Sequence, residues 1–189
     1  MNAYQPARPR TWRRWLPWVF VACVVAATNL PVRHWINLPW SHSVDSQAAR
    51  DAEIILKHAG SSGIRHAVDV IRAIDGDTFE ARVHLEPGRD LNARIRLRGI
   101  DAPELKAGCA QELRMAEVAT AGLRAVLAEG DVRIFNVGPD KYAGRVVADV
   151  ATRRTANVSN AMLTAGYVRS YGGGRRNGWC GNGDQAPPK

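Results

Sequence analysis

Hydrophobic and charged residues alternate along two stretches in the middle of the chain. Residues 79–85 place Phe, Ala, Val and Leu at every second position, and residues 93–97 place Ala, Ile and Leu in the same way. Arg94, Arg96 and Arg98 lie on the opposite face of the second stretch. A period of two is typical of a half-buried strand, and turn-forming residues at 86–90 separate the stretches. The pattern therefore predicts a two-stranded hairpin.

The hydrophobic period becomes helical after Cys109. One face of the predicted helix carries Leu113, Ala116, Thr120, Leu123 and Leu127. Strands are predicted near 132–137 and 145–151, and a short helix near 158–165 ends at Gly166. With a first strand beginning near Ala67, this order predicts an α+β, mainly β fold, a five-stranded barrel with helices packed on it.

The N-terminal region has a different pattern. Residues 15–32 are uncharged and would span about 27 Å as a helix, and four arginines precede them in residues 1–14. The positive-inside rule places residues 1–14 in the cytoplasm and the rest of the chain across the membrane. We expect an anchor in a bacterial inner membrane, with the domain on the periplasmic or extracellular side. Signal cleavage near Ala27 would instead give a secreted or periplasmic protein, whereas a buried helix of the domain would leave the flanking charge unexplained.

Residues 33–66 are expected to form a linker or stalk with a short helix beginning near Asp45 or Ser46. Ala48, Ala52, Ile55 and Ala59 would share one face of this helix. The globular domain is expected to occupy residues 67–180, and residues 181–189 are expected to form a flexible tail.

The net charge of +8 is unevenly distributed. Five arginines and no acidic residue precede residue 41, so the remainder of the chain has a net charge of only +3. Affinity for a polyanion would therefore come from a few placed cations and not from a broad basic surface. A hydrophobic fraction of 46% excludes a wholly disordered chain.

Charged residues gather at three predicted strand ends, 75–78, 96–104 and 140–145. Each cluster alone has an ordinary interpretation. Asp-Gly is a common tight-turn dipeptide, Asp-Ala-Pro-Glu is a plausible helix entry, and a single arginine on a strand is usually solvated.

Together the three clusters supply the groups that phosphodiester hydrolysis requires. Asp77 and Asp101, with a backbone carbonyl such as that of Ala102, are hard oxygen ligands suited to Ca²⁺ or Mg²⁺. Arg96 and Arg145 can bind phosphate oxygens. Glu104 can take a proton from an attacking water molecule.

These three motifs, in this order, resemble the staphylococcal nuclease (thermonuclease) family. The resemblance implies an OB-fold barrel and a Ca²⁺-dependent nuclease that acts on DNA and RNA and leaves 3′-phosphates. It further implies specific roles for the site residues. Asp77, Asp101 and the carbonyl of Ala102 would bind Ca²⁺, Glu104 would be the general base, Arg96 and Arg145 would bind phosphate, and Lys141 and Tyr142 would contact a nucleotide's phosphate and sugar. Two departures are an extra residue, Ala143, and the lack of a long C-terminal helix.

A non-catalytic OB-fold module that binds nucleic acid or protein outside the membrane is the alternative. Such modules of this family have typically lost the acidic and arginine residues, and this chain retains them. We therefore expect an endonuclease with DNA or RNA as substrate, tethered to the membrane through residues 15–32. We predict no protein partner and expect a monomer.

Cys109 and Cys180 are the only cysteines of the predicted domain. A bridge between them would tie the first domain helix to the C-terminal end and contribute about 4 kcal/mol in the chain-entropy account. The alternative is two buried free thiols. A bridge would agree with export, because disulfides persist in oxidising compartments.

Overall fold

The structure is a computed structural model that describes residues 39–59, 63–86 and 88–181. The predicted cytoplasmic segment 1–14, the predicted anchor or signal peptide at 15–32 and most of the predicted tail lie outside the described residues. Within the described ranges, no helix combines the length and the apolar character needed to cross a membrane. The chain divides into units Met1–Ser41 and His42–Lys189, and the barrel lies in the second.

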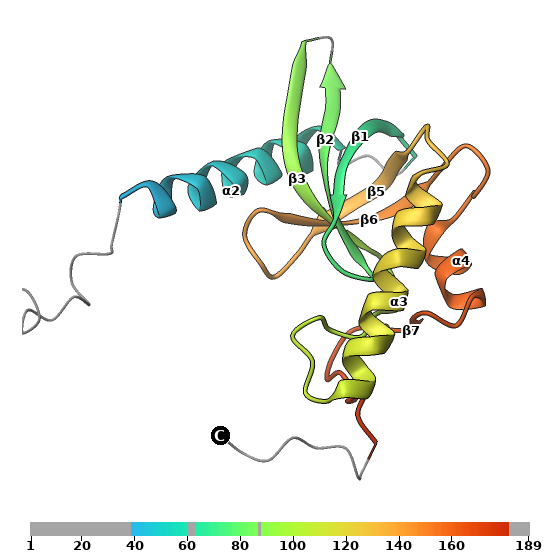
Figure 1. Cartoon of the computed structure of the whole chain (residues 1–189). Coiled ribbons are helices and arrows are strands. Elements are labelled where there is room, and N and C mark those ends of the chain that lie inside the picture. Colours follow the sequence, from blue (N-terminus) through green and yellow to red (C-terminus); the bar gives the residue numbers. More distant parts are fainter. Residues whose placement is uncertain (1–38, 60–62, 87, 182–189) are drawn as a thin grey trace, which may run out of the picture. The chain divides into compact units, whose positions relative to one another are not determined.

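A closed barrel forms the centre of the domain (Figure 1). Its strands are β1 (His66–Ala73), β2 (Thr78–Glu86), β3 (Arg89–Leu97), β5 (Arg133–Pro139) and β6 (Arg145–Ala151). They pair in the order β1-β2-β3-β6-β5, with β3 parallel to β6 and the other pairs antiparallel. The five-stranded barrel predicted from the alternating pattern is confirmed. A separate pair joins β4 (Ile100–Asp101) to β7 (Arg169–Ser170).

The described residues form helices α2 (Pro39–Ala59), α3 (Ala110–Leu127) and α4 (Val158–Thr164). The helical face predicted for α3 is buried at Ala116, Thr120, Leu123 and Leu127. The prediction for Leu113 is wrong, since this residue is 40% exposed and Glu112 is buried in its place. The carboxylate of Glu112 accepts hydrogen bonds from the backbone N–H groups of the preceding loop, which turns this side of the first helical turn inward.

Helix α2 contributes directly to the core of the domain. Ala52, Ile55 and Ala59, predicted on one face, are buried in the same cluster as Phe79 and Ile95 of the barrel. Full burial of an isoleucine side chain stabilises a fold by about 1.5–3 kcal/mol. The helix begins at Pro39 and not at Asp45 or Ser46 as expected. Proline suits the first helical position, because the N–H that it lacks would have no partner there. The core thus includes part of the segment expected to be a linker.

Candidate active site

The turn between β1 and β2 carries the first cluster of charged residues. The N–H groups of Ile74 and Asp75 donate to the carbonyl of Thr78, at 2.9 and 3.2 Å, and Asp75 Oδ1 accepts from the N–H of Asp77 at 3.0 Å. A Cβ at Gly76 would lie 2.6 Å from the Cβ of Ala119 in α3. Only glycine therefore allows the turn to pack this closely on α3.

Asp77 and Arg96 form a buried ion pair between β2 and β3. Their side chains are only 4% and 9% exposed, and Arg96 Nη1 donates to Asp77 Oδ1. The other oxygen, Oδ2, accepts from the N–H of Ala102 at 3.1 Å, and Arg96 Nη2 donates to the carbonyl of Ile100 at 3.0 Å. Buried charges require this degree of pairing. The structure thus brings together Asp77, Arg96 and the backbone at Ala102.

Asp101 lies on β4, where β7 pairs with it. Its side chain is 1% exposed, and Oδ2 accepts from Arg169 Nε and Nη2 at 3.1 and 2.8 Å. Arg176 Nε is 3.0 Å from Oδ1. This approach lacks hydrogen-bond geometry, and no other described group donates to Oδ1. Asp101 therefore has a buried oxygen that is ion-paired but not hydrogen-bonded.

Glu104, the predicted general base, is half exposed. Its Oε1 pairs with Arg176 Nη1, so the same guanidinium bridges Glu104 and Asp101. The N–H of Glu104 donates to Glu112 Oε1 at 3.4 Å, and Glu112 Oε2 accepts from the N–H of Gly108 at 2.9 Å. Glu112 thereby fixes the loop that carries Glu104.

Arg145 stands at the start of β6 and is held by Asp140. Its Nε and Nη2 donate to Asp140 Oδ2 and Oδ1 at 2.9 and 3.2 Å, and its guanidinium lies 4.5 Å from the centre of the Tyr142 ring. Lys141 Nζ lies 5.0 Å from the same ring. The loop containing Ala143 turns at Gly144, whose φ is +76° and whose added Cβ would lie 3.0 Å from Ala48 of α2. Arg145 and Arg96 both line a hollow of about 310 Å³.

Charge in the site shifts several pKa values. Burial, together with the charges of Asp77 and Glu104, raises the pKa of Asp75 to about 6. Burial alone would raise the pKa of Asp140, but hydrogen bonds from Arg145 and the Tyr142 N–H outweigh it and lower that pKa. Burial would lower the pKa of Arg176, but the surrounding carboxylates outweigh it and raise that pKa. The carboxylates that gather here are those of Asp75, Asp77, Asp101 and Glu104.

Two charged residues of the site, Arg169 and Arg176, were not identified from the sequence, and Asp75 was named in the first cluster without a role. Arg169 also donates to the carbonyls of Asn177 and Gly178 and stacks on Trp179, 4.1 Å from its ring centre. It therefore holds the segment that carries Arg176. The cysteine pair was the one available signal, because joining Cys180 to Cys109 brings this segment beside residues 101–104.

Cys109 and Cys180 are joined by a disulfide, with Cα atoms 6.0 Å apart. Glu112 lies within 4.8 Å of both sulfurs, an arrangement that could otherwise suggest a metal site. The disulfide removes both thiolates, and the Glu112 carboxylate already accepts from two backbone N–H groups. This cluster is therefore structural and fastens the C-terminal segment to the start of α3.

The arrangement of carboxylates suits a hard divalent cation. Ca²⁺ prefers carboxylate and carbonyl oxygens, and the site offers Asp77 and Asp101 beside the backbone of Ala102. Oδ1 of Asp101 is the clearest ligand atom, because it is buried without a hydrogen bond; the ion would take the place of the Arg176 guanidinium, whose Nε lies 3.0 Å from this oxygen. The residues present therefore fit the cation that the sequence resemblance implies.

Comparison with known proteins agrees with this geometry. Residues 94–178 match the family described as staphylococcal nuclease homologue. The matched range contains Arg96, Asp101, Glu104 and Arg145, and it begins after Asp77. The chain has no match among curated proteins.

Proposed function

Because this chain carries a domain of the staphylococcal nuclease homologue family, we propose that it is a nuclease that hydrolyses phosphodiester bonds of DNA, RNA or both. One observation carries the proposal. Arg96 and Arg145 line a single hollow, and Arg96 is hydrogen-bonded to one of the buried carboxylates beside it, Asp77. Cations placed to bind a phosphate and oxygens suited to a metal ion are thus neighbours, as hydrolysis of a charged diester requires.

We assign Asp77, Asp101 and the carbonyl of Ala102 as the groups that would hold Ca²⁺. The bound ion would supply positive charge next to the phosphate and polarise it. The buried Oδ1 of Asp101 supports this assignment, because it lacks a hydrogen bond within the described residues and its ion-pair partner, Arg176, would be replaced by the metal ion.

The two arginines bind and orient the phosphate. Arg145 uses Nε and Nη2 on Asp140, and no described acceptor lies at its Nη1, which leaves that group to donate to a phosphate oxygen. Arg96 is held by Asp77 and the carbonyl of Ile100. Preorganised donors of this kind stabilise the charge that develops on phosphorus without reorganising during the reaction. Lys141 and Tyr142, at the rim, would contact the sugar and phosphate of the bound nucleotide.

Glu104 accepts the proton of the attacking water molecule in this proposal. Its side chain is 50% exposed, so water can reach the carboxylate. Arg176 neutralises Glu104 in the structure and has to move away from it before the carboxylate can act as a base.

We also propose that the nuclease is exported and tethered through residues 15–32, or released after cleavage near Ala27. The uncharged segment behind four arginines supports export. The Cys109–Cys180 disulfide supports it independently, since such bonds persist in oxidising compartments.

The decisive experiment is cleavage of single-stranded DNA and RNA by the purified full chain, with Ca²⁺ and with EDTA. We expect EDTA-sensitive cleavage that falls at least 100-fold in Glu104→Gln and in Arg145→Ala. The exposed Arg114 of α3 provides a matched control, because Arg114→Ala removes the same charge outside the site. Tight binding of DNA without cleavage under any divalent cation would favour the non-catalytic module instead.

Arg96→Ala is a poorer test of the same idea. It would leave the carboxylate of Asp77 buried without its partner, and loss of one member of a buried ion pair costs about 3–5 kcal/mol of stability. A loss of activity in this variant could therefore reflect unfolding.

A further inference from the structure

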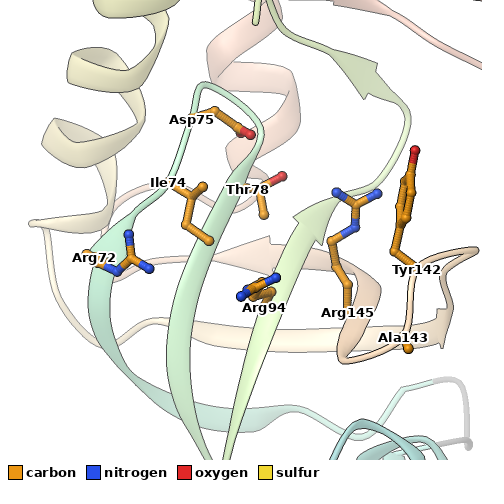
Figure 2. A pocket seen from close by; sticks show the side chains of 8 residues that line it. All are labelled: Arg72, Ile74, Asp75, Thr78, Arg94, Tyr142, Ala143 and Arg145. Atoms are coloured by element: carbon orange, nitrogen blue, oxygen red, sulfur yellow. The ribbon is translucent and has the colours of Figure 1, made fainter. Parts of the chain in front are cut away.

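A second hollow, of about 590 Å³, lies next to the proposed catalytic groups (Figure 2). Its walls come from the end of β1 and the turn after it, from β3, and from the loop that leads into β6. Arg145 lines both this hollow and the one that contains Arg96. The two hollows are therefore adjacent, and a substrate that reaches Arg145 can extend into the second.

Three guanidinium groups line the second hollow, and two of them are already paired. Arg72 Nε lies 2.8 Å from Glu80 Oε2, and Arg145 is held by Asp140. The third arginine, Arg94, is exposed, and its side chain has no ion pair or hydrogen bond within the described part of the chain. Arg94 is thus an arginine without an ion pair on the wall of a hollow that Asp75 also lines. Glu80, its cross-strand neighbour on β2, is paired with Arg72.

The register of the barrel aligns Arg94 with the catalytic arginines. Arg94 and Arg96 lie two positions apart on β3, so they share a face at a separation of roughly 6.8 Å along the strand. Across the parallel pair, Arg94 is the partner of Arg145. Cations that share one face of a strand in this way can contact successive phosphates of one nucleic-acid strand. A phosphate bound by Arg96 and Arg145 would therefore place the next one near Arg94.

The remaining wall suits the sugar and base of a nucleotide. The Tyr142 ring is 54% exposed and lies beside the Arg145 guanidinium in Figure 2, and Ile74 and Ala143 add apolar surface. Exposed aromatic rings next to cations are typical of sites that bind single-stranded nucleic acid.

We propose that this hollow is a subsite for the nucleotide next to the scissile phosphate, and that Arg94 binds the phosphate of that nucleotide. This inference rests on the proposed nuclease function and defines the substrate as an oligonucleotide with at least two phosphates. The net charge outside the N-terminal segment is only +3. Loss of Arg94 should therefore lower the affinity for nucleic acid measurably, because no broad basic surface can replace it.

The first test measures binding of fluorescein-labelled dT8 by anisotropy in EDTA, where hydrolysis is blocked, over a range of salt concentrations. Each phosphate contact on a single strand contributes about 0.7 to the slope of log K against log salt. Arg94→Gln should lower that slope by about 0.7 and weaken binding about tenfold at low salt. Arg94→Lys should keep the slope, and the control Arg114→Gln should leave both quantities near those of the parent.

The second test compares cleavage of dT8 with cleavage of thymidylyl-thymidine, which has only the scissile phosphate. Arg94→Gln should lower kcat/KM about tenfold on dT8 and leave the dinucleotide unchanged. An equal loss on both substrates, or a salt slope no lower than that of Arg114→Gln, would overturn the subsite. Failure of the parent to cleave either substrate would count against the nuclease proposal, whereas the anisotropy in EDTA would still test the subsite.

Discussion

The ionised carboxylate of Asp75 in the β1–β2 turn destabilises the fold, and replacing it with a neutral side chain should stabilise the protein. Its carboxyl group is buried beside Asp77 and near Glu104, and this raises its pKa from 3.8 to about 6. The folded state therefore holds the proton more tightly than the unfolded chain does. By linkage, stability contributed by Asp75 is fully present below pH 3.8 and is lost as the pH rises towards 6 and above.

The magnitude follows from the two pKa values. Each pH unit between them corresponds to 1.36 kcal/mol, so ionised Asp75 destabilises the fold by roughly 2–4 kcal/mol at pH 7.5 and by less than about 1 kcal/mol at pH 4. Asp75→Asn removes the charge while keeping the shape and an oxygen that can accept from the Asp77 N–H. We expect the variant to exceed the parent in stability by these amounts.

The assay is equilibrium urea unfolding of parent and variant in EDTA, followed by circular dichroism from pH 4 to pH 7.5. Asp131→Asn is the matched control. Asp131 pairs with Arg153 at 2.8 Å, and the hydrogen bond and charge of Arg153 lower its pKa, so its loss should not raise stability at any pH. If Asp75→Asn were no more stable than the parent at pH 7.5, the inference that Asp75 ionises against its neighbours would be refuted.

Two further predictions concern packing and the C-terminal segment. Gly76→Ala should lower stability by about 1–3 kcal/mol, because its Cβ would meet side-chain carbons at 2.6 and 2.9 Å; urea unfolding should show no such loss for Gly172→Ala, where the space is open and φ is ordinary. Cys180→Ser should cost about 2–5 kcal/mol and free the segment that carries Arg176. In urea unfolding, dithiothreitol should lower the stability of the parent and leave that of Cys180→Ser unchanged. An equal loss of stability in both proteins would contradict the structural role of the disulfide.

The secondary structure was largely readable from the sequence. The alternation in residues 79–85 and 93–97 predicted β2 and β3, and both are paired strands of the barrel. The step of three and four residues after Cys109 predicted α3. These signals are local, because strand and helix periods depend only on backbone geometry over a few residues. The prediction failed at Leu113. This residue is exposed because its neighbour Glu112 is turned inward by hydrogen bonds from the preceding loop.

Only part of the candidate site could be predicted from the sequence. The types and order of Asp77, Arg96 and Arg145 indicated phosphate chemistry, and the structure places Arg96 and Arg145 on one hollow and pairs Asp77 with Arg96. Nothing in the local pattern showed that Arg96 is buried in an ion pair with Asp77, since Arg94 on β3 and Arg98 just after its end are both exposed.

By itself, the sequence determined which elements form and which chemical groups lie at their ends. The tertiary structure alone decided which of those groups become partners. The contacts that define the site join Asp77 to Arg96, 19 positions apart, Asp101 to Arg169, 68 positions apart, and Glu104 to Arg176, 72 positions apart. Such pairs depend on strand register and on the closure of the chain by the disulfide, because these bring distant residues within ion-pair distance. Burial then raises the cost of leaving any of these charges unpaired.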